Sequence, residues 1–265
     1  MRLMATDLDG TLLGPGGTLS ARNIAALQAA KDAGWYVVLA TGRPPFMVAE
    51  LMPQLGTAAT HGVMANGSVV ATLPHMELLR TIRFEIDLAI HVVDVLRGFD
   101  SDYHFALATD TGFAHEPGFD ERMPAPTPTP PTADVLIAAA EATEAIKLMV
   151  FHDRYGAHEL LGLLPTVLGT DINVTHMGAD CVEVGPAGID KATALTFLCE
   201  RLGVHRTDVV AFGDEFNDHE MLLWAGHGVA VANAHQATRD LADEVTLANV
   251  DDGVAITIER LLAAG

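Results

Sequence analysis

The chain has 265 residues, of which 49% are hydrophobic and 19% are charged. This balance is typical of a globular protein with one large or two modest domains, and it excludes a disordered, collagen-like or disulfide-scaffold chain. Asp and Glu number 35 against 15 Lys and Arg, a formal net charge of −20. We therefore expect no nucleic-acid partner and no anionic membrane surface, because phosphate groups bind basic surfaces. An acidic protein that acts on anions needs a local cation, most simply a divalent metal.

The sequence lacks the usual marks of export or membrane insertion. The N-terminal residues turn acidic at Asp7 before an apolar signal segment can form, and no run reaches the roughly 18 apolar residues of a membrane span. Cys181 and Cys199 are too few for a disulfide framework, so we expect two buried thiols. These features predict a cytoplasmic protein, while the oligomeric state stays open.

The first part of the chain alternates between strands and helices. A strand is predicted over Arg2–Thr6, followed by a helix with Ser20 as its N-cap and Gly34 at its end. The apolar runs Trp35–Ala40 and Gly62–Ala65 are typical of buried parallel strands. This alternation predicts an α/β fold with a doubly wound, Rossmann-like parallel sheet.

The same alternation returns near the C-terminus. The elements predicted there are a helix from Asp190 to Gly203, a strand over Val209–Phe212, a helix over Phe216–Ala225, a strand over Gly228–Ala232, and helices over His235–Ala242 and Gly253–Ala263.

The middle of the chain mixes helices and strands without this regular order. Helices are predicted over Ile86–Phe99, Ala133–Thr143 and His158–Leu168, and strands over Lys147–His152, Ile172–His176 and Cys181–Val184. The proline-rich run Met123–Pro131 is predicted to be a loop, because proline lacks the amide donor and restrains its neighbour. We therefore predict an α/β core of residues 1–82 and 188–265, with an α+β cap domain of residues 83–187 inserted into it.

Two carboxylates follow the first predicted strand in the segment Asp7-Leu8-Asp9-Gly10-Thr11. In an open α/β sheet, functional groups gather at the carboxyl ends of the strands. Asp7 and Asp9 would repel each other there unless a cation lay between them, and Gly10 permits a tight turn with accessible amides. The alternative interpretation is a solvated acidic turn before a helix.

Two weaker signals lie at other strand and helix ends. Thr41 and Gly42 follow the second predicted strand and offer a hydroxyl and a bare amide to an anionic oxygen, although this pair is also ordinary turn chemistry. Lys191 follows the N-cap Asp190, where its charge opposes the helix dipole. This placement favours an ammonium group that reaches an anion elsewhere in the fold. The alternative is a surface lysine paired with Asp190 or Glu183.

The segment from Gly213 to Asp218 adds further acids after another apolar strand. Carboxylates that converge from different strands, with positions left for water, suit Mg²⁺. The alternative is an acidic helix start favoured by the helix dipole. All four signals lie at strand carboxyl ends or at helix N-termini that face the same edge, so together they favour one common site.

These motifs resemble those of the haloacid dehalogenase superfamily, and within it the Cof-like sugar-phosphate phosphatases with a large α/β cap. The likeness covers nearly the whole chain in order, including the insertion of the cap. The segments that carry it are Asp7-x-Asp9-Gly10-Thr11, Thr41-Gly42-Arg43, Asn66-Gly67, Lys191, Gly213-Asp214-x-x-Asn217-Asp218, Ala232-Asn233-Ala234 and Asp252-Gly253-Val254.

The resemblance implies a Mg²⁺-dependent phosphomonoester hydrolase that acts on small phosphorylated metabolites such as sugar phosphates. Asp7 would attack phosphorus to form an aspartyl-phosphate, and Asp9 would serve as general acid and then general base. Thr41, Lys191 and backbone amides would stabilise the phosphoryl oxygens.

The same resemblance implies the remaining site residues. Mg²⁺ would be held by the Asp7 carboxylate, the Asp9 main-chain carbonyl and Asp214. The residues implied to bind the substrate or to support these groups are Leu8, Gly10, Gly42, Arg43, Asn66, Asn217 and Asp218. For Asp218 the implied role is to orient Lys191 or a bound water.

Three other functions are alternatives to a phosphatase. A response-regulator receiver domain also forms an aspartyl-phosphate, but it is much shorter and lacks the second carboxylate and the cap. A phosphomutase of the same superfamily would pass the phosphoryl group to a second sugar hydroxyl, and product analysis separates it from a hydrolase. A non-catalytic sugar-phosphate sensor is disfavoured because Asp9 is intact. The predicted cap has 17 Asp and Glu against 5 Lys and Arg, which favours a small monophosphate ester over a polyanion.

Overall fold

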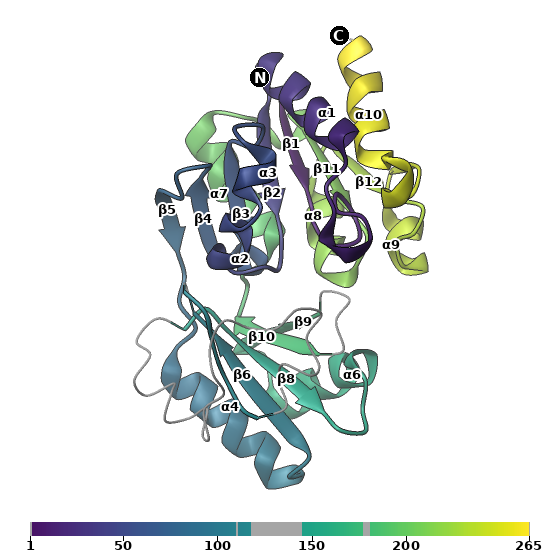
Figure 1. Cartoon of the computed structure of the whole chain (residues 1–265). Coiled ribbons are helices and arrows are strands. Elements are labelled where there is room, and N and C mark those ends of the chain that lie inside the picture. Colours follow the sequence, from purple (N-terminus) through teal and green to yellow (C-terminus); the bar gives the residue numbers. More distant parts are fainter. Residues whose placement is uncertain (1, 110, 118–144, 177–180, 265) are drawn as a thin grey trace. The chain divides into compact units, whose positions relative to one another are not determined.

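A computed structural model of the chain describes residues 2–109, 111–117, 145–176 and 181–264. The chain divides into two compact units (Figure 1). One comprises Met1–Thr81 and Asp190–Gly265, and the other comprises Ile82–Ile189. They are called the core unit and the inserted unit below.

The core unit is built on an eight-stranded sheet. Its strand order is β13 (Glu244–Val245), β12 (His227–Ala230), β11 (Val209–Gly213), β1 (Leu3–Thr6), β2 (Tyr36–Ala40), β3 (His61–Met64), β4 (Val69–Thr72) and β5 (Leu78–Thr81). From β13 to β3 the neighbouring strands pair in parallel, with β1 at the centre between β11 and β2. The predicted α/β class is thereby confirmed.

One edge of this sheet departs from the parallel pairing of the other strands. There β3, β4 and β5 pair in antiparallel fashion. The cause is the short turn Ala65–Gly67 between β3 and β4, because a parallel connection needs a crossover of a dozen residues or more. The sequence prediction contained no strand at β4 or β5.

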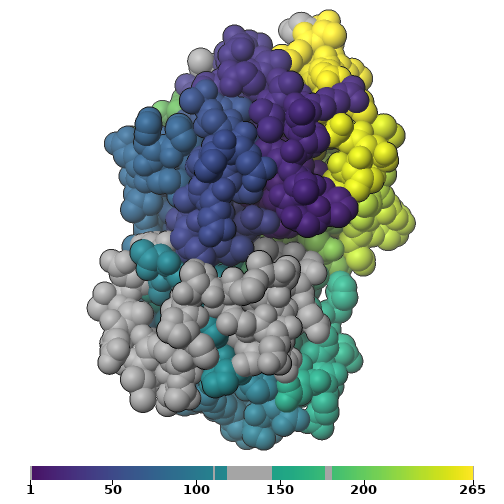
Figure 2. Space-filling model, viewed as in Figure 1, coloured from purple at the N-terminus to yellow at the C-terminus, as the bar shows by residue number. Residues whose placement is uncertain are grey.

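Helices cover both faces of the core sheet (Figure 1). On one face α1 (Ala21–Asp32) packs against α10 (Gly253–Ala263), so that an N-terminal and a C-terminal segment lie side by side (Figure 2). On the other face α7 (Lys191–Leu202) and α8 (His219–Trp224) pack on apolar residues of β1, β2, β3 and β11. The shorter helices are α2 (Pro45–Ala49), α3 (Met52–Leu55) and α9 (Gln236–Leu241), with 3₁₀ turns at Pro15–Gly17, Ala65–Gly67, Arg206–Asp208, Phe216–Asp218 and Asn249–Asp251. Among the described residues, no helix has the length and apolarity needed to span a membrane.

Several predicted helix ends are confirmed by their hydrogen bonds. The Ser20 side chain accepts from the amide of Asn23 at the start of α1. The Asp190 carboxylate accepts from the amide of Thr193 at 2.7 Å, and α7 ends at the left-handed Gly203. This N-cap fixes where α7 begins, and therefore where Lys191 lies.

The inserted unit has an antiparallel five-stranded sheet with helices on one face. The strand order is β7 (Phe113–His115), β6 (Tyr103–Ala108), β8 (Lys147–His152), β10 (Val182–Pro186) and β9 (Ile172–Thr175). The helices α4 (Ile86–Phe99) and α6 (Ala157–Leu168) close a separate apolar core. The prediction missed β6 and β7, while the predicted helix Ala133–Thr143 and loop Met123–Pro131 lie outside the described residues.

A buried asparagine ties the loop after β1 to the C-terminal helix. Asn23 is 2% exposed. Its Nδ2 donates to the carbonyl oxygen of Leu12 at 3.1 Å, and its Oδ1 accepts from the amide of Ala255 at 3.1 Å. Asn23 therefore fixes the loop that carries Asp7 and Asp9 against the opposite end of the chain.

We expect Asn23→Ala to lower the free energy of unfolding by about 2–4 kcal/mol, because it leaves a buried carbonyl and a buried amide without partners. Urea unfolding measures the change. Gln28→Ala is the control: it removes a surface hydrogen bond to Asp32 on the same helix, and should change stability by less than about 0.5 kcal/mol. Equal losses in both variants would contradict the role given to Asn23.

Candidate active site

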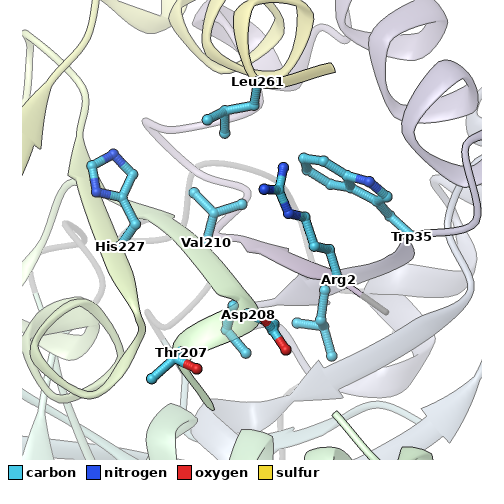
Figure 3. Close-up of a pocket in the computed structure, with 9 residues that line it drawn as sticks. Arg2, Trp35, Thr207, Asp208, Val210, His227 and Leu261 are labelled. Carbon is cyan, nitrogen blue, oxygen red and sulfur yellow. The ribbon is translucent and has the colours of Figure 1, made fainter. Parts of the chain in front are cut away.

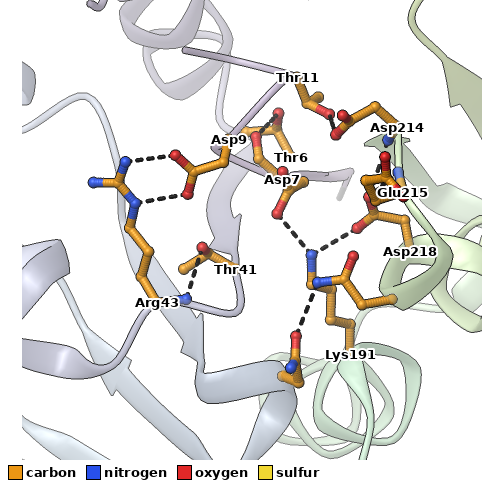
Figure 4. Close-up of polar contacts among 12 residues, drawn as sticks. Thr6, Asp7, Asp9, Thr11, Thr41, Arg43, Lys191, Asp214, Glu215 and Asp218 are labelled. Carbon is orange, nitrogen blue, oxygen red and sulfur yellow. Dashed lines mark hydrogen bonds and ion pairs between the residues drawn. The ribbon is translucent and has the colours of Figure 1, made fainter. Parts of the chain in front are cut away.

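The motifs singled out in the sequence meet at one edge of the core sheet (Figure 4). Asp7 follows β1, Thr41 follows β2 and Asp214 follows β11, so all three leave the carboxyl ends of adjacent parallel strands. Lys191 is the first residue of α7, whose N-terminus reaches the same edge. The strand order explains this meeting, because β1 lies between β2 and β11.

Lys191 is the cation at the centre of the cluster. Its side chain is fully buried, and its Nζ donates to Asp7 Oδ1 at 2.7 Å and to Asp218 Oδ1 at 2.6 Å. The alternative of a surface lysine is therefore wrong, and Glu183 pairs with Lys147 instead. Burial opposes the charge of Lys191, but the carboxylates of Asp218 and Asp7 outweigh this and raise its pKa above the ordinary value.

Two carboxyl groups of the cluster have strongly raised pKa values. Burial is the main cause for Asp7, and with repulsion from Asp218 and Asp9 it outweighs the attraction of Lys191, raising the pKa to about 7. Burial also dominates for Asp214, where the charges of Asp7 and Asp218 help to raise the pKa to about 9. The site thus holds more negative charge than Lys191 compensates.

Hydrogen bonds hold the loop after β11 against the loop after β1. The hydroxyl of Thr11 donates to Asp214 Oδ1 at 2.6 Å. Asp218 Oδ2 accepts from the amides of Asp214 and Glu215, at 2.9 and 3.1 Å. Asp218 therefore uses one carboxylate oxygen for Lys191 and the other to shape the turn that presents Asp214.

Asp9 points away from Lys191 and contacts Arg43. The guanidinium donates from Nε to Asp9 Oδ2 at 2.7 Å and from Nη2 to Asp9 Oδ1 at 2.5 Å. The carboxylate remains one-third exposed. The backbone amide of Arg43 also donates to the hydroxyl oxygen of Thr41 at 3.1 Å. This two-point contact fixes the plane of the Asp9 carboxylate beside the cluster.

The third group of site residues lies beside α7. Asn217 Nδ2 donates to Asn66 Oδ1 at 3.0 Å. The amide of Asn66 donates to the carbonyl oxygen of Thr41 at 3.0 Å. Asn66 and Asn217 are both buried, so they link the loops after β2, β3 and β11.

Gly10 and Asn233 shape the loop that carries Asp7 and Asp9. Gly10 has a φ of +81°, and a Cβ there would lie 2.1 Å from Asp214 Oδ2. Asn233 Nδ2 donates to the carbonyl oxygen of Gly10 at 2.8 Å, and its Oδ1 accepts from the amide of Asn249 at 2.9 Å. No role was expected for Asn233 from the sequence. The signal that points to it is an asparagine just after the predicted strand that ends in Ala232.

The residues present fit a small divalent cation. One carboxylate oxygen from each of Asp7, Asp214 and Asp218 lies within 4.8 Å of the others, and all three side chains are buried. An all-oxygen set with unbalanced negative charge is the environment that Mg²⁺ takes in proteins. The role expected for Asp218 from the sequence was only a supporting one, yet one of its oxygens belongs to the same group of three carboxylate oxygens.

A separate cavity opens at the other ends of the same strands (Figure 3). It has a volume of about 170 Å³ and is lined by Arg2, Trp35, Val210 and His227, among others. These residues lie just before the strands β1 and β2 or within the first two positions of β11 and β12, whereas the carboxylates follow the strands. None of the sequence-predicted site residues lines this cavity, which we therefore separate from the candidate active site.

Comparison with known proteins gives one family over nearly the whole chain. The model of the haloacid dehalogenase-like hydrolases matches residues 4–258. The 5-amino-6-(5-phospho-D-ribitylamino)uracil phosphatase YitU of Bacillus subtilis is 31% identical, over 96% of this chain and 94% of that protein. The pyridoxal phosphate phosphatase YbhA of Escherichia coli is 29% identical, over 96% of each chain.

The fold has solved counterparts as well. The structure of a haloacid dehalogenase-like hydrolase from B. subtilis aligns with a TM-score of 0.83 and 28% identity. The alignment covers 98% of this chain and 100% of that one. The likeness therefore extends over the core unit and the inserted unit.

We expect Gly10→Ala to weaken Mg²⁺ binding by at least about tenfold, because the new methyl group displaces the Asp214 carboxylate. Isothermal titration of the metal measures the effect. Gly16→Ala is the matched control: Gly16 has a similar φ of +69°, but nothing lies within 4 Å of its added Cβ. If both variants lose Mg²⁺ affinity to the same extent, backbone strain and not the clash with Asp214 controls binding. If neither variant loses affinity, the close approach of Gly10 to Asp214 does not control binding.

We expect the metal-free protein to lose stability as the pH rises from about 4 towards 9. Carboxyl groups with raised pKa values, about 7 for Asp7 and about 9 for Asp214, bind more protons in the folded than in the unfolded state over this interval. The contribution of these two carboxyl groups to the free energy of unfolding is fully present at low pH. It disappears as the pH rises past their folded-state pKa values.

Thermal unfolding in EDTA between pH 5 and 9 measures this slope. Asp214→Asn should flatten it, whereas Asp32→Asn on α1 removes a charge of the same sign from outside the cluster and should not. Added Mg²⁺ should restore stability at the alkaline end. A slope that is unchanged by Asp214→Asn would assign the effect to the overall negative charge of the chain.

Proposed function

The chain belongs to the haloacid dehalogenase-like hydrolase family, and we propose that it hydrolyses phosphate monoesters of small metabolites through an aspartyl-phosphate on Asp7. The observation that carries this proposal is the buried ion pair of Asp7 and Lys191, 2.7 Å apart, beside Asp214 and Asp218. Burying such charges costs free energy, so a buried ion pair is weak evidence of a purely stabilising role. The two relatives described above are both named phosphatases.

In the first chemical step an Asp7 oxygen attacks phosphorus. The Asp7 O–P bond forms while the bond from phosphorus to the ester oxygen breaks. Lys191 favours the ionised, nucleophilic form of Asp7 through the contact at Oδ1. Asp9 gives its proton to the departing ester oxygen, so the alcohol leaves as a neutral molecule.

In the second step water hydrolyses the aspartyl-phosphate. Asp9 takes a proton from the water as its oxygen bonds to phosphorus, and the bond from phosphorus to the Asp7 oxygen breaks. Inorganic phosphate leaves, and Asp7 and Asp9 return to their initial forms. The contact with Arg43 fixes the position of the Asp9 carboxylate beside the cluster.

The charge that develops on the phosphoryl oxygens needs donors around it. Lys191, the Thr41 hydroxyl and the amides of Leu8–Gly10 and Gly42 are the groups proposed to supply them. Mg²⁺, held by Asp7, Asp214 and the Asp9 main-chain carbonyl, would offset the repulsion between the anionic nucleophile and the phosphate. Asp218 would hold Lys191 in place through their contact of 2.6 Å.

We propose the inserted unit as the cap domain that selects the leaving group. Its acidic composition, 17 Asp and Glu against 5 Lys and Arg over residues 83–187, favours an ester with one phosphate over a polyanion. The names of the relatives support this class, since one is named for a phosphoribityl-aminouracil and the other for pyridoxal phosphate. Both are small molecules with a single phosphate ester.

The test is phosphate release from a panel of phosphomonoesters, with and without Mg²⁺. We expect Mg²⁺-dependent release by the wild type and a loss of at least about 10³-fold in Asp7→Asn, because the amide cannot act as the nucleophile. Asp214→Asn should retain activity only at much higher Mg²⁺ concentrations. Asp32→Asn, on α1 and outside the cluster, is the control and should match the wild type.

The product distinguishes hydrolysis from the related activities. An isomerised ester without free phosphate would identify a phosphomutase. No turnover of any ester by the folded wild type, together with thermal stabilisation by a sugar phosphate, would identify a binding protein. Retention of most activity by Asp7→Asn would overturn the mechanism.

A further inference from the structure

The turn between β3 and β4 has an unusual backbone. Three consecutive residues have positive φ angles: Ala65 at 48°, Asn66 at 52° and Gly67 at 100°. Only the last of these is a glycine. The left-handed conformation is unfavourable for Ala65, whereas asparagine tolerates it better than other residues with a Cβ. All three are buried. Strain of this kind persists only where surrounding contacts hold it, and it gathers at functional sites.

The amides and side chain of this turn contact two loops of the candidate active site. The amide of Ala65 donates to the carbonyl oxygen of Arg43 at 2.9 Å, and that of Asn66 to Thr41 at 3.0 Å. Asn66 Oδ1 accepts from Asn217 at 3.0 Å. The left-handed backbone therefore sets the positions of the loops after β2 and β11.

The other side of the turn lies against the start of α7. A Cβ on Gly67 would lie 2.2 Å from the carbonyl oxygen of Asp190. The next residue along the chain is Lys191, which bonds to Asp7. A displacement of the turn would therefore reach the catalytic cation through the backbone at Asp190.

Arg80 on β5 holds this turn from the edge of the sheet. Its Nη2 donates to the carbonyl oxygen of Gly67 at 3.3 Å, and its guanidinium carbon lies 4.7 Å from the ring centroid of Phe197. Phe197 belongs to α7, the helix that begins with Lys191. One guanidinium thus bridges the turn and the helix of the catalytic lysine.

The surroundings of Arg80 make its guanidinium group costly for the stability of the fold. Its Nε is buried and has no hydrogen-bond partner among the described residues. Burial lowers the pKa of its guanidinium. A donor that is buried without a partner costs free energy, so an apolar side chain of similar length would stack on Phe197 at a lower cost.

We propose that Arg80 is a positioning residue for the reaction, which holds the Ala65–Gly67 turn and, through it, the loops of Thr41 and Asn217 and the start of α7. This proposal rests on the proposed phosphatase function. Arg80 lies one residue before Thr81, the last residue before the inserted unit, and Asp190 is the first residue after it. Both segments that lead to the inserted unit therefore contact the same turn.

The test compares two substitutions of Arg80 in the full-length, Mg²⁺-loaded protein. Arg80→Met keeps the length and the contact with Phe197 but removes the donor to Gly67, and we expect kcat to fall about tenfold with KM changed less than about twofold. Arg80→Lys keeps a donor and should recover most of the lost kcat. If Met were tolerated and Lys were not, Arg80 would be a packing residue and the proposal would be wrong.

Arg206→Met is the matched control. Arg206 also donates to a main-chain carbonyl, that of Trp224 at 2.9 Å, but it precedes β11 at the opposite end from the site. We expect its kcat to stay within about twofold of the wild type. A tenfold loss in this control would mean that kcat follows general stability.

A double-mutant comparison tests whether Arg80 acts through the turn. If it does, Arg80→Met adds little further loss of kcat to Asn66→Ala, because the link to Asn217 is already broken. Independent, multiplicative losses would overturn the proposal. Amide hydrogen exchange supplies a readout without turnover: Arg80→Met should speed exchange over residues 65–68 and leave β12 unchanged.

These readouts separate the two proposals. A wild type without phosphatase activity, but with faster exchange of the turn in Arg80→Met, would refute the function and retain the structural link. An active wild type with unchanged kcat and unchanged exchange in Arg80→Met would refute the role of Arg80 alone.

Discussion

The structure depends on the burial of several carboxylates at one end of the central strand around a single buried ammonium group. Asp7 and Asp218 both bond to Lys191, and Asp214 lies near them without a comparable ion pair among the described residues. Burial and mutual repulsion therefore raise the pKa values of Asp7 and Asp214. Such an arrangement is stable only where the surrounding backbone is held firmly and where a further cation has room to bind.

Different contacts hold the loops of the core unit around these carboxylates. Gly10 lets the backbone approach the Asp214 carboxylate closely, and Asn233 holds the carbonyl of Gly10 from the C-terminal segment. On the other side, the Ala65–Gly67 turn connects the loops after β2 and β11 and receives Arg80. None of these supporting groups is charged except Arg80, so they shape the site without adding to its excess of negative charge.

Much of the fold could be predicted because its longer elements have local signals. The helices α4 and α10 have the predicted bounds, and α7 begins at Lys191 because Asp190 caps it. The strands β4 to β7 could not be predicted in the same way. The strands β4, β5 and β7 have only three or four residues each, whereas β6 is as long as β8 and its length does not explain why it was missed. The hydrogen bonds of all four are made with partners that only the folded sheet brings alongside.

For the site, local residue patterns are enough to place Asp7, Thr41 and Asp214 at one edge, because each follows an apolar strand of a parallel sheet. How these groups pair with one another depends on the folded chain. Lys191 contacts Asp7 across 184 positions of sequence, Arg43 bonds to Asp9, and Asn233 supports the loop of Gly10 across 223 positions. Arg80 bonds to Gly67, 13 positions away, on a turn between two neighbouring strands. Local residue patterns specify strand ends and helix caps, whereas contacts between distant segments follow from the strand order and from how the helices pack on the sheet.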